Sequence, residues 1–293
     1  MRVLITGCYG QVGCSLTEQL AKGANREVLA LDRDSLDITN QEAVNAAVIE
    51  FKPTIIINAA AHTAVDKAEE EVELSYAINR DGPKYLAQAA QDVGAAILHI
   101  STDYVFEGNK VGEYDESDIT NPQSVYGSSK LAGEIAVAEV CDKHIILRTA
   151  WVFGENGNNF VKTMLRLGAT HNALSIVGDQ FGGPTYAVDI AKALIQIAER
   201  ISQNDKIEYG IYHLSGLPHV SWYEFAETIF DTALEKGIIK KKPNLTSIIT
   251  EQYPTPAKRP SNSCLNTDKI TNAFSIEASD WKTALNKIQA YTG

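Results

Sequence analysis

A tyrosine and a lysine stand four residues apart in the stretch Tyr126-Gly-Ser-Ser-Lys130. On a helix, this spacing places both side chains on one face. A lysine ammonium beside a phenol favours the phenolate and lowers the pKa of the phenol from its usual value of about 10. Such a tyrosine can exchange a proton with a carbonyl or alcohol oxygen, which is general acid–base catalysis. The same pair is common on helix surfaces, so its meaning depends on the rest of the chain.

The beginning of the chain carries a pattern that is typical of pyrophosphate binding. The apolar run Met1–Thr6 is followed by Gly7, Gly10 and Gly13, and then by a helical pattern. Glycines permit a tight turn and a close approach of the backbone, while a helix N-terminus offers free N–H groups and a positive dipole end. We therefore predict a dinucleotide-binding turn, against the alternative of a strand–helix turn that binds nothing.

A carboxylate and a guanidinium follow the second strand, predicted over residues 28–31. Asp32 lies 19 residues past Gly13, near the spacing expected for a group that binds the adenosine ribose. Arg33 comes next and could instead neutralise a 2′-phosphate. Asp32 favours NAD and Arg33 favours NADP, so the sequence leaves the choice open. The segment Asp37–Asn40 is either a wall on the adenine side or a simple helix cap.

Length and composition exclude several classes of protein. The 293 residues carry a net charge of −11 with a pI near 5.1, which argues against broad contact with nucleic acid or an anionic membrane. The sequence has no apolar run of 18 residues, and its first residues predict a strand rather than a signal peptide. The cysteines show no paired spacing, which favours reduced thiols in a cytoplasmic protein: Cys8, Cys14, Cys141 and Cys264.

Strand-like and helical runs alternate along the first half of the chain. This alternation predicts an α/β fold of the Rossmann type, a doubly wound parallel sheet with helices on both faces. The predicted strands are 2–6, 28–31, 54–58, 96–100 and 144–149. The predicted helices are 11–22, 40–50, 71–92 and 126–141.

The pattern loosens after Trp151, where we expect a second, smaller α/β domain. We predict a dinucleotide-binding domain over 1–150 and a mainly substrate-binding domain over 151–293. Part of about 185–215 is expected to return to the first domain, because Tyr209–Leu214 looks like a strand of the first sheet. The helices expected in this half are 158–168, 187–201, 221–236 and 279–290.

Polar residues follow several of the predicted strands, at the sheet edge where ligands of doubly wound folds bind. Thr102 follows one strand directly, so its hydroxyl is predicted to share a pocket with Tyr126 and Lys130 and to hold a substrate oxygen. Thr, Tyr and Lys together make a reductase triad. His62 follows another strand and is interpreted as a loop residue near the cofactor rather than a general base, because no partner carboxylate is identifiable.

Segments throughout the chain resemble the dTDP-4-dehydrorhamnose reductase family of the extended short-chain dehydrogenase/reductase superfamily. The resemblance runs from residue 2 to the final helix, and its matches after residue 150 separate this family from other extended short-chain reductases. The segments that carry it are Asn58–Ala68, Ser101–Phe106, Val125–Gly127, Lys130–Glu134, Arg148–Thr149, Trp151–Val152, Gly157–Phe160, Asp179–Thr185 and Tyr253–Pro260.

The resemblance implies that NADPH or NADH reduces the C4 ketone of dTDP-4-dehydro-β-L-rhamnose to give dTDP-L-rhamnose. It implies that Tyr126 supplies the proton, that Lys130 holds the nicotinamide ribose and tunes Tyr126, and that Thr102 polarises the ketone oxygen. The residues that it places along the cofactor are Gly10, Gln11, Val12, Asp32, Asp37, Ile38, Ala61, His62 and Thr63. The residues that it places against the nucleotide sugar are Thr102, Asp103 and Trp151.

Two of the substrate residues have alternative interpretations. Trp151 offers a flat apolar face to a sugar or base, but it could equally be a core residue at the junction of two domains. Arg259 could pair with the substrate diphosphate, or it could be a solvated loop charge. Some family members also hold Mg²⁺ at a dimer interface with an acidic residue just after the glycine turn. Here that position is Ser15, which cannot replace a carboxylate ligand, so we predict no metal and, for a homodimer, one without Mg²⁺.

Other functions remain as alternatives. A sugar-nucleotide 4,6-dehydratase needs an acid–base pair, and its relatives place Asp-Glu after the threonine, where this chain has Asp103-Tyr104. A 4-epimerase or another nucleotide-sugar reductase is a further alternative. Similar folds also serve as non-catalytic regulatory subunits of methionine adenosyltransferase, but the intact triad favours catalysis.

Overall fold

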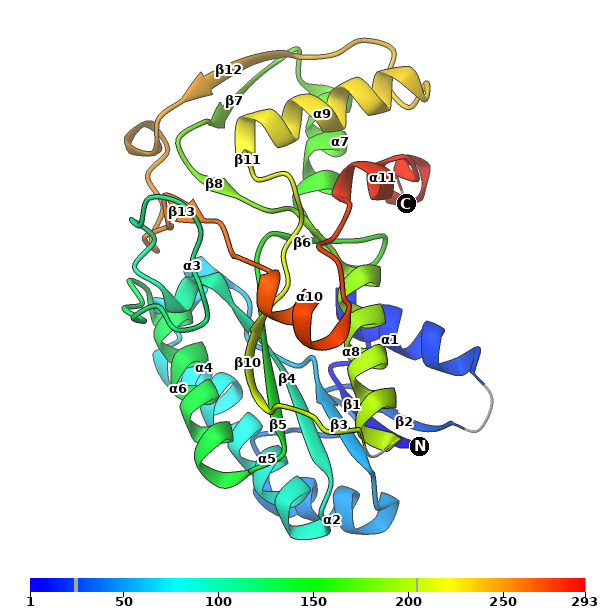
Figure 1. The fold of residues 1–293 in the computed structure, drawn as a ribbon. Coiled ribbons are helices and arrows are strands. Elements are labelled where there is room, and N and C mark those ends of the chain that lie inside the picture. Colours follow the sequence, from blue (N-terminus) through cyan, green and yellow to red (C-terminus); the bar gives the residue numbers. More distant parts are fainter. Residues whose placement is uncertain (24–25, 204, 293) are drawn as a thin grey trace.

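The computed structural model describes residues 1–23, 26–203 and 205–292, and its largest element is a six-stranded parallel sheet. The strand order is β10-β5-β4-β3-β1-β2, with every neighbouring pair parallel. All five predicted strands are confirmed, and the one expected near residues 209–214 pairs with β5 (Figure 1). The strands are β1 (Arg2–Thr6), β2 (Glu27–Leu31), β3 (Ile55–Asn58), β4 (Ala96–Thr102), β5 (His144–Thr149) and β10 (Gly210–His213).

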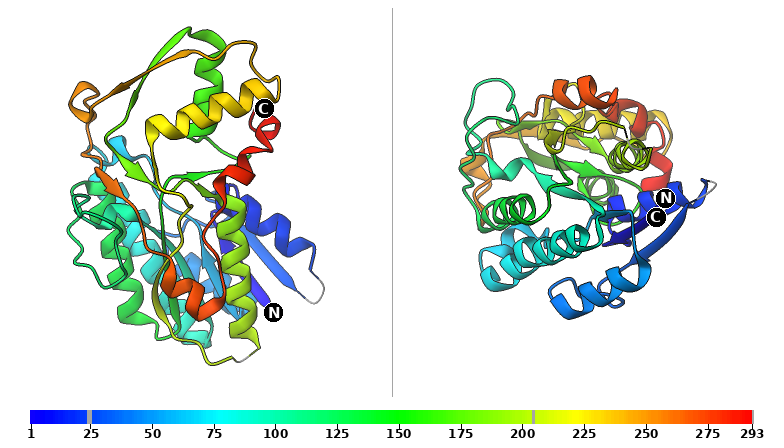
Figure 2. Two further views of the ribbon diagram at one scale, coloured as in Figure 1. Left: turned by 45° about the horizontal axis from the view of Figure 1, so that its top comes forward. Right: turned by 60° about the horizontal axis from the view of Figure 1, so that its bottom comes forward.

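Helices cover both faces of this sheet, as the right-hand view of Figure 2 shows. On one face lie α1 (Gln11–Ala21) and α8 (Ala187–Ser202), and on the other lie α2 (Gln41–Phe51), α5 (Gly82–Val93) and α6 (Val125–Val140). Successive strand residues point to opposite faces, so the side chains of β1 pack against both helical layers. Val3 and Ile5 pack toward α1 and α8, whereas Leu4 packs toward the other three helices. The predicted doubly wound fold is therefore confirmed.

The single helix predicted over residues 71–92 is broken in the structure. It consists of α4 (Val72–Tyr76), a π-helical turn (Ala77–Asp81) and α5. Pro83 has no N–H with which to bond the carbonyl of Asn79, so a regular helix cannot continue through this point. The turn lets α6 approach closely, since a Cβ on Gly133 would lie 2.0 Å from Asn79 O. Asn79 is thereby held beside the cofactor-side loops.

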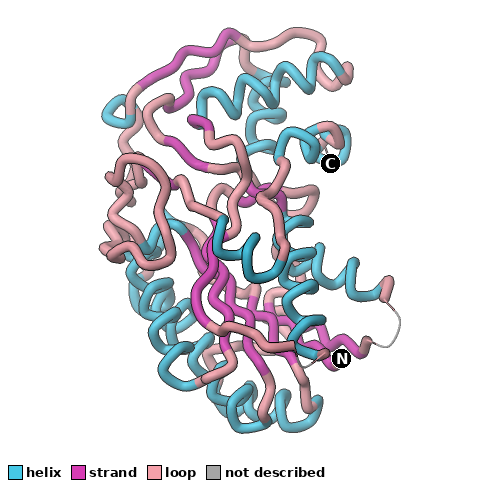
Figure 3. The backbone as a smooth tube through the Cα atoms, in the orientation of Figure 1, coloured by secondary structure: helices cyan, strands magenta, loops and turns pink. Residues whose placement is uncertain are grey.

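The second half of the chain packs around an apolar core of its own. Figure 3 shows its helices and short strands beyond the carboxyl ends of the main sheet. A parallel pair, β7 and β12, lies at the outer end. Its elements are β6 (Val152–Phe153), α7 (Phe160–Thr170), β7 (Ala173–Val177), β8 (Phe181–Gly182), β9 (Thr185–Tyr186), β11 (Val220–Ser221), α9 (Trp222–Glu235), β12 (Asn244–Ile248), β13 (Asn262–Ser263) and α11 (Trp281–Leu285). A further helix, α10 (Asp268–Phe274), instead lies beside β10, and its Ile270 and Phe274 belong to the core of the main sheet.

The helices predicted in this half are present, with one that is shorter than expected. The segment predicted as a helix over 279–290 contains α11 and then a 3₁₀ turn (Ile288–Tyr291). The start of α9 is fixed by a capping box in which Ser221 and Glu224 bond each other's backbone. Among the residues that the structure describes, no helix has the length and apolar character needed to cross a membrane.

Candidate active site

The site lies at the carboxyl ends of the sheet strands, next to β1. In the strand order, β2 lies on one side of β1 and β3 lies on the other. Ligands of doubly wound folds bind where the strand order reverses in this way. A cavity of about 500 Å³ opens here, and a second hollow of about 400 Å³ adjoins it beside β2. Gly10 and Ala59–Ala61 line both, so the two form one continuous trough.

The glycine turn after β1 is shaped for close backbone contacts. Gly7 has φ of +73°, and a Cβ there would lie 2.6 Å from Ala60 N. A Cβ on Gly13 would lie 2.1 Å from Gly7 O, so Gly13 lets α1 pack against the turn from behind. Gly10 precedes α1 without a side-chain cap, which leaves the first N–H groups of the helix available to an anion. Gly10 lines the trough together with Gln11 and Val12, as predicted.

The hollow beside β2 contains the residues predicted to bind the adenosine end. It is lined by Gly7, Asp32, Arg33, Asp37, Ile38, Ala61 and His62. Asp32 Oδ1 accepts bonds from Ser35 N at 2.9 Å and from Ser35 Oγ at 2.6 Å, and these bonds lower the pKa of the carboxyl group. Asp37 Oδ1 is bonded in the same way by Thr39, while Asn40 caps α2. Both carboxylates are therefore ionised at the mouth of this hollow.

His62 has a carboxylate partner that the sequence did not reveal. Its Nε2 lies 3.1 Å from Glu71 Oε2, and its Nδ1 lies 2.9 Å from Ser75 Oγ. Its backbone N–H donates to Asn79 Oδ1 at 2.8 Å. No partner carboxylate was identifiable from the sequence, and the structure supplies Glu71, which reaches back across the turn before α4. With both ring nitrogens engaged and its backbone clamped, His62 shapes the wall of the trough.

Tyr126 lies in the first turn of α6, whose start is capped by Ser124 accepting from Gly127 N at 3.1 Å. The Tyr126 ring packs edge-on against Tyr104, with centroids 5.4 Å apart. Burial raises the pKa of Tyr126 to about 12, while a hydrogen bond with Thr102 acts in the opposite direction. The phenol therefore keeps its proton at neutral pH and is set up as a proton donor.

Lys130 lies one turn further along α6, and its ammonium group points toward β4. Lys130 Nζ donates to Ile100 O at 2.6 Å. Burial lowers the pKa of Lys130 to about 8, with Glu134 opposing this shift. The expectation that Lys130 acidifies Tyr126 is wrong in this structure, because burial dominates the phenol and the ammonium bonds to the strand. Tyr126 and Lys130 nevertheless line the same cavity, as predicted.

Thr102 ends β4, and its hydroxyl faces the cavity as predicted. Thr102 Oγ1 donates to Asp103 Oδ1 at 3.0 Å and accepts from Tyr104 N at 3.2 Å. Ser263 donates to Asp103 Oδ2 at 2.5 Å. Burial raises the pKa of Asp103 to about 6, although its bonds from Ser263 and Thr102 act to lower it. Asp103 thus joins the end of β4 to β13.

The cavity also contains two hydroxyl groups without a partner among the described protein atoms. Ser101 Oγ and Thr149 Oγ1 are buried, line the cavity, and have no hydrogen-bond partner among the described residues. Unpartnered buried hydroxyls are rare in native structures. Ser101 and Thr149 belong to β4 and β5, whereas Asp32 follows β2 at the other end of the strand order, so polar groups line both parts of the trough.

A third cavity of about 440 Å³ shares Tyr104 and Trp151 with the first. The Trp151 indole stacks on Trp222 with centroids 3.5 Å apart, and a Cβ on Gly182 would lie 2.7 Å from Trp151 Cε2. Trp151 thus packs at the junction between the two halves and also lines both cavities. Arg259 lines the third cavity and forms two bonds to Asp66, at 3.1 and 2.9 Å.

Comparisons with known proteins agree with this site. The family model for the RmlD substrate binding domain matches residues 1–292. The dTDP-4-dehydrorhamnose reductase of Aggregatibacter actinomycetemcomitans is 54% identical over 290 residues, 99% of each chain. The solved dTDP-4-dehydrorhamnose reductase from Clostridium acetobutylicum has a TM-score of 0.90, with 45% identity over 99% of this chain and 98% of its own. The chain belongs to the dTDP-4-dehydrorhamnose reductase family.

A solved member of the same family is described with its cofactor. The dTDP-4-dehydrorhamnose reductase from Bacillus anthracis, in complex with NADP, has a TM-score of 0.88 and is 40% identical over 98% of each chain. This family membership confirms the resemblance that the sequence motifs indicated.

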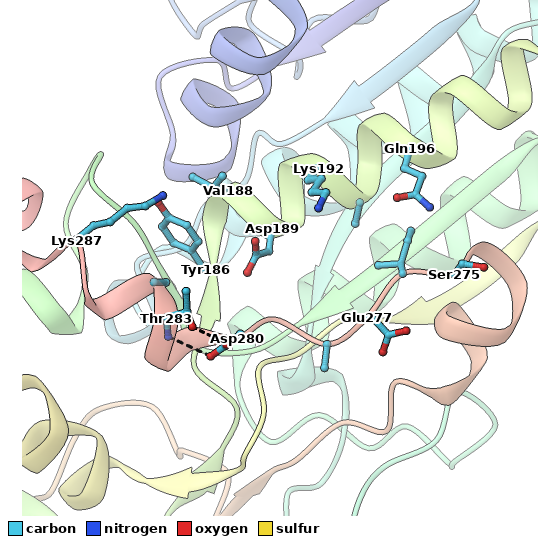
Figure 4. Close-up of a pocket in the computed structure, with 14 residues that line it drawn as sticks. Tyr186, Val188, Asp189, Lys192, Gln196, Ser275, Glu277, Asp280, Thr283 and Lys287 are labelled. Carbon is cyan, nitrogen blue, oxygen red and sulfur yellow. Dashed lines mark hydrogen bonds between the residues drawn. The ribbon is translucent and has the colours of Figure 1, made fainter.

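A further hollow of about 380 Å³ lies away from this site, between α8 and residues 275–287 (Figure 4). Side chains of both charges surround it, including Asp189, Lys192 and Lys287, and Asp189 Oδ2 accepts from Ser279 Oγ at 2.6 Å. Among the described residues, none of the unpartnered buried polar atoms belongs to this hollow. The trough, where Ser101 Oγ and Thr149 Oγ1 have no protein partner, is therefore the candidate site.

Several residues of the trough were given no role from the sequence, although they follow predicted strands or lie in segments that carry the family resemblance. They are Ser101, Tyr104, Thr149, Gly157 and Asn158, and all line the cavity with Tyr126. The segment around Gly157 could not be placed, because it reaches the glycine turn through a bond from Asn159 Nδ2 to Gln11 Oε1.

Proposed function

We propose that this protein reduces the C4 ketone of dTDP-4-dehydro-β-L-rhamnose to dTDP-L-rhamnose, using NADPH or NADH. The observation that carries the proposal is the placement of a protonated, partly buried phenol in the same trough as the glycine turn. Tyr126 lines the cavity together with Gly10–Val12 on one side and Trp151 on the other. The names of the related enzymes, and the NADP in one of them, support the same reaction.

The residues along the trough fit a nicotinamide dinucleotide. The uncapped start of α1 and Gln11 and Val12 would receive the pyrophosphate. Asp32 or Arg33 would meet the adenosine ribose or its 2′-phosphate, and Asp37, Ile38 and Ala61–Thr63 would line the remaining length. The Ser101 and Thr149 hydroxyls would gain partners at the nicotinamide end. When bound there, the reduced nicotinamide supplies the hydride.

Tyr126 donates its proton to the oxygen at sugar C4 as that carbon is reduced. A phenol that burial keeps protonated suits this direction of transfer. Thr102 holds the ketone oxygen beside Tyr126, which requires its hydroxyl proton to turn from Asp103 toward the substrate. Lys130 holds the nicotinamide ribose, and Trp151, Asp103 and Arg259 contact the nucleotide sugar.

Neighbouring activities are less well supported by this site. In place of the second carboxylate of a 4,6-dehydratase stands Tyr104, a partly buried phenol whose pKa is raised by desolvation. A regulatory subunit would have no need for Thr102, Tyr126 and Lys130 around one cavity.

The proposal is tested by following nicotinamide absorbance with purified protein, NADPH or NADH, and synthetic dTDP-4-dehydro-β-L-rhamnose. We expect sugar-dependent oxidation of the nicotinamide and formation of dTDP-L-rhamnose. Absence of oxidation with both cofactors, while the cofactor still binds, would favour a non-catalytic role.

The organisation of the chain and its surroundings form a second part of the proposal. We assign residues 1–150, together with α8, β10 and α10, to a dinucleotide-binding domain and the rest to a substrate-binding domain.

We also propose that the enzyme works in the cytoplasm and that its self-association needs no Mg²⁺. Ser15 is buried, and its hydroxyl donates to Gln11 O at 3.1 Å instead of facing outward. A change in the molar mass of the protein in solution when a chelator removes Mg²⁺ would contradict this independence from the metal.

A further inference from the structure

A row of buried polar side chains crosses the sheet beneath Lys130. It comprises Thr6 on β1, Asn58 on β3, His99 on β4 and Lys130 on α6, each at most 2% exposed. Thr6 Oγ1 donates to Asn58 Oδ1 at 2.7 Å, and Asn58 Nδ2 lies 3.0 Å from His99 Nδ1. His99 Nε2 in turn lies 3.4 Å from Lys130 Nζ. The row ends in a residue of the proposed catalytic triad.

One backbone group fixes the direction of every bond in this row. Ala60 N lies 3.1 Å from the Asn58 side chain, and an amide N–H can only donate, so Asn58 must present Oδ1 to it. Asn58 Nδ2 must then face His99 Nδ1. Because Nδ2 is also a donor, Nδ1 must be the unprotonated nitrogen of a neutral ring.

His99 is therefore the Nε2–H tautomer, and its N–H points at Lys130 Nζ. An ammonium group has three N–H donors and no lone pair, so it cannot accept a hydrogen bond from the His99 N–H. The two groups would then face each other as two donors. A neutral amine would accept from His99 Nε2 while still donating to Ile100 O at 2.6 Å. The arrangement favours the amine over the ammonium.

We propose that Asn58 holds His99 as the Nε2–H tautomer and that His99, as a positioning residue, weakens the hold of Lys130 on its proton. The proposal rests on the proposed function only for its consequence. In each reduction Tyr126 gives a proton to the sugar oxygen and must regain one that ultimately comes from water. Lys130 and Tyr126 line the same cavity, so the charge that Lys130 carries is part of the surroundings of this transfer.

Other charged groups around Lys130 do not account for the effect. Glu134, on the same helix, favours the ammonium, but Arg148 holds it with bonds of 2.6 and 2.9 Å. Asp103 lines the same cavity, and its burial favours the uncharged acid. Burial lowers the pKa of His99 well below its usual value, which keeps the ring neutral. Burial also lowers the pKa of Lys130 to about 8, in the direction that the bond geometry requires.

The first experiment reads the tautomer directly in the protein without cofactor. Long-range ¹H–¹⁵N correlation on histidine-labelled protein shows which ring nitrogen carries the proton, with His99→Gln identifying the signal. We expect Nε2 to be protonated, and a proton on Nδ1 would overturn the proposal. Asn58→Asp presents two acceptor oxygens in the same shape, so it should switch His99 to the Nδ1–H tautomer. An unchanged tautomer in that variant would show that Asn58 does not set it.

The second experiment follows the titration of Lys130 by ¹³C NMR of lysine labelled at Cε, with Lys130→Arg identifying the signal. In His99→Gln the amide can turn its oxygen toward the ammonium, so the midpoint should rise by roughly one pH unit. Thr6→Val is the matched control, because it removes a bond of the row while Ala60 still orients Asn58. Its midpoint should match that of the unmodified protein.

A midpoint that does not rise in His99→Gln would overturn the role of His99. Should His99→Gln fail to fold, Asn58→Asp and the tautomer of the unmodified protein decide the matter. Neither readout uses turnover, so a protein without the proposed reductase activity would still give a clear answer here.

Discussion

Ser263 on β13 donates a hydrogen bond of 2.5 Å to Asp103 Oδ2 at the end of β4. The bond connects the second half of the chain to a carboxyl group whose other oxygen accepts from Thr102 at 3.0 Å. Any movement of β13 relative to the sheet therefore acts on Asp103 and Thr102 together. The buried Asp103 carboxyl group therefore connects β13 to Thr102, a residue of the proposed catalytic triad.

Asp103 should make the stability of the protein depend on pH. Burial raises its pKa to about 6 from 3.8, so the folded state binds this proton more tightly than the unfolded state. The stabilisation is fully present below about pH 4 and is lost as the pH rises through about 6, by about 3 kcal/mol in all. Chemical denaturation across this range should show a smaller loss for Asp103→Asn. Asp34→Asn, at an exposed site, serves as the control, and parallel curves for Asp103→Asn and the unmodified protein would refute the assignment.

Replacing Tyr126 by Phe should abolish proton donation and leave the cofactor site intact. We expect turnover to fall by at least about a hundredfold, as is typical for the loss of a general acid, with the Kd for NADPH unchanged. Tyr209→Phe removes a hydroxyl outside the cavity and is the matched control. Unchanged turnover in Tyr126→Phe would remove this residue from the mechanism.

Asp32 should favour the binding of NADH, and Arg33 should favour the binding of NADPH. Both line the adenosine hollow, where Asp32 suits a ribose diol and Arg33 suits a 2′-phosphate. Arg33→Ala should weaken NADPH binding by roughly ten- to a hundredfold and leave NADH unaffected, since a bond to a charged group is lost. Asp32→Asn should weaken NADH more than NADPH. Isothermal titration with each cofactor measures both effects, and equal losses for the two cofactors would contradict the assignment.

Arg259 should act on substrate binding and not on chemistry. It lines the cavity beside Trp151 while Asp66 orients its guanidinium with two bonds. Arg259→Met should raise the KM for the nucleotide sugar by about tenfold, with kcat and the KM for NADPH nearly unchanged. Lys258→Met, which removes the exposed neighbouring charge, is the control. A KM that stays constant would mean that Arg259 only ties its loop to Asp66 in α3 (Val65–Ala68).

The parts of the site that could be predicted from sequence are those carried by contiguous residues. The strand, glycine turn and helix around Gly7 and Gly10 are encoded within about 20 positions, because backbone sterics and apolar pattern act locally. Asp32 and Thr102 were placed correctly for the same reason, since each directly follows a predicted strand. Their side chains line the trough where the strand ends put them.

The parts that were wrong depend on partners that the sequence does not bring together. Lys130 was expected to act on Tyr126, but its ammonium is held by Ile100 O, 30 residues away on β4. His62 was left without a carboxylate, because Glu71 reaches it only through the turn before α4. Burial also decides the pKa of Tyr126, and burial depends on the packing of the whole site.

The central claim is that this trough transfers hydride to sugar C4 while Tyr126 supplies a proton to its oxygen. It is tested most directly with NADPH that carries deuterium at the transferable position of its nicotinamide C4, incubated with dTDP-4-dehydro-β-L-rhamnose. NMR of the product should show one deuterium at C4 of dTDP-L-rhamnose and one equivalent of NADP⁺. An unreduced or merely epimerised sugar, or a product with no deuterium at C4, would contradict the account.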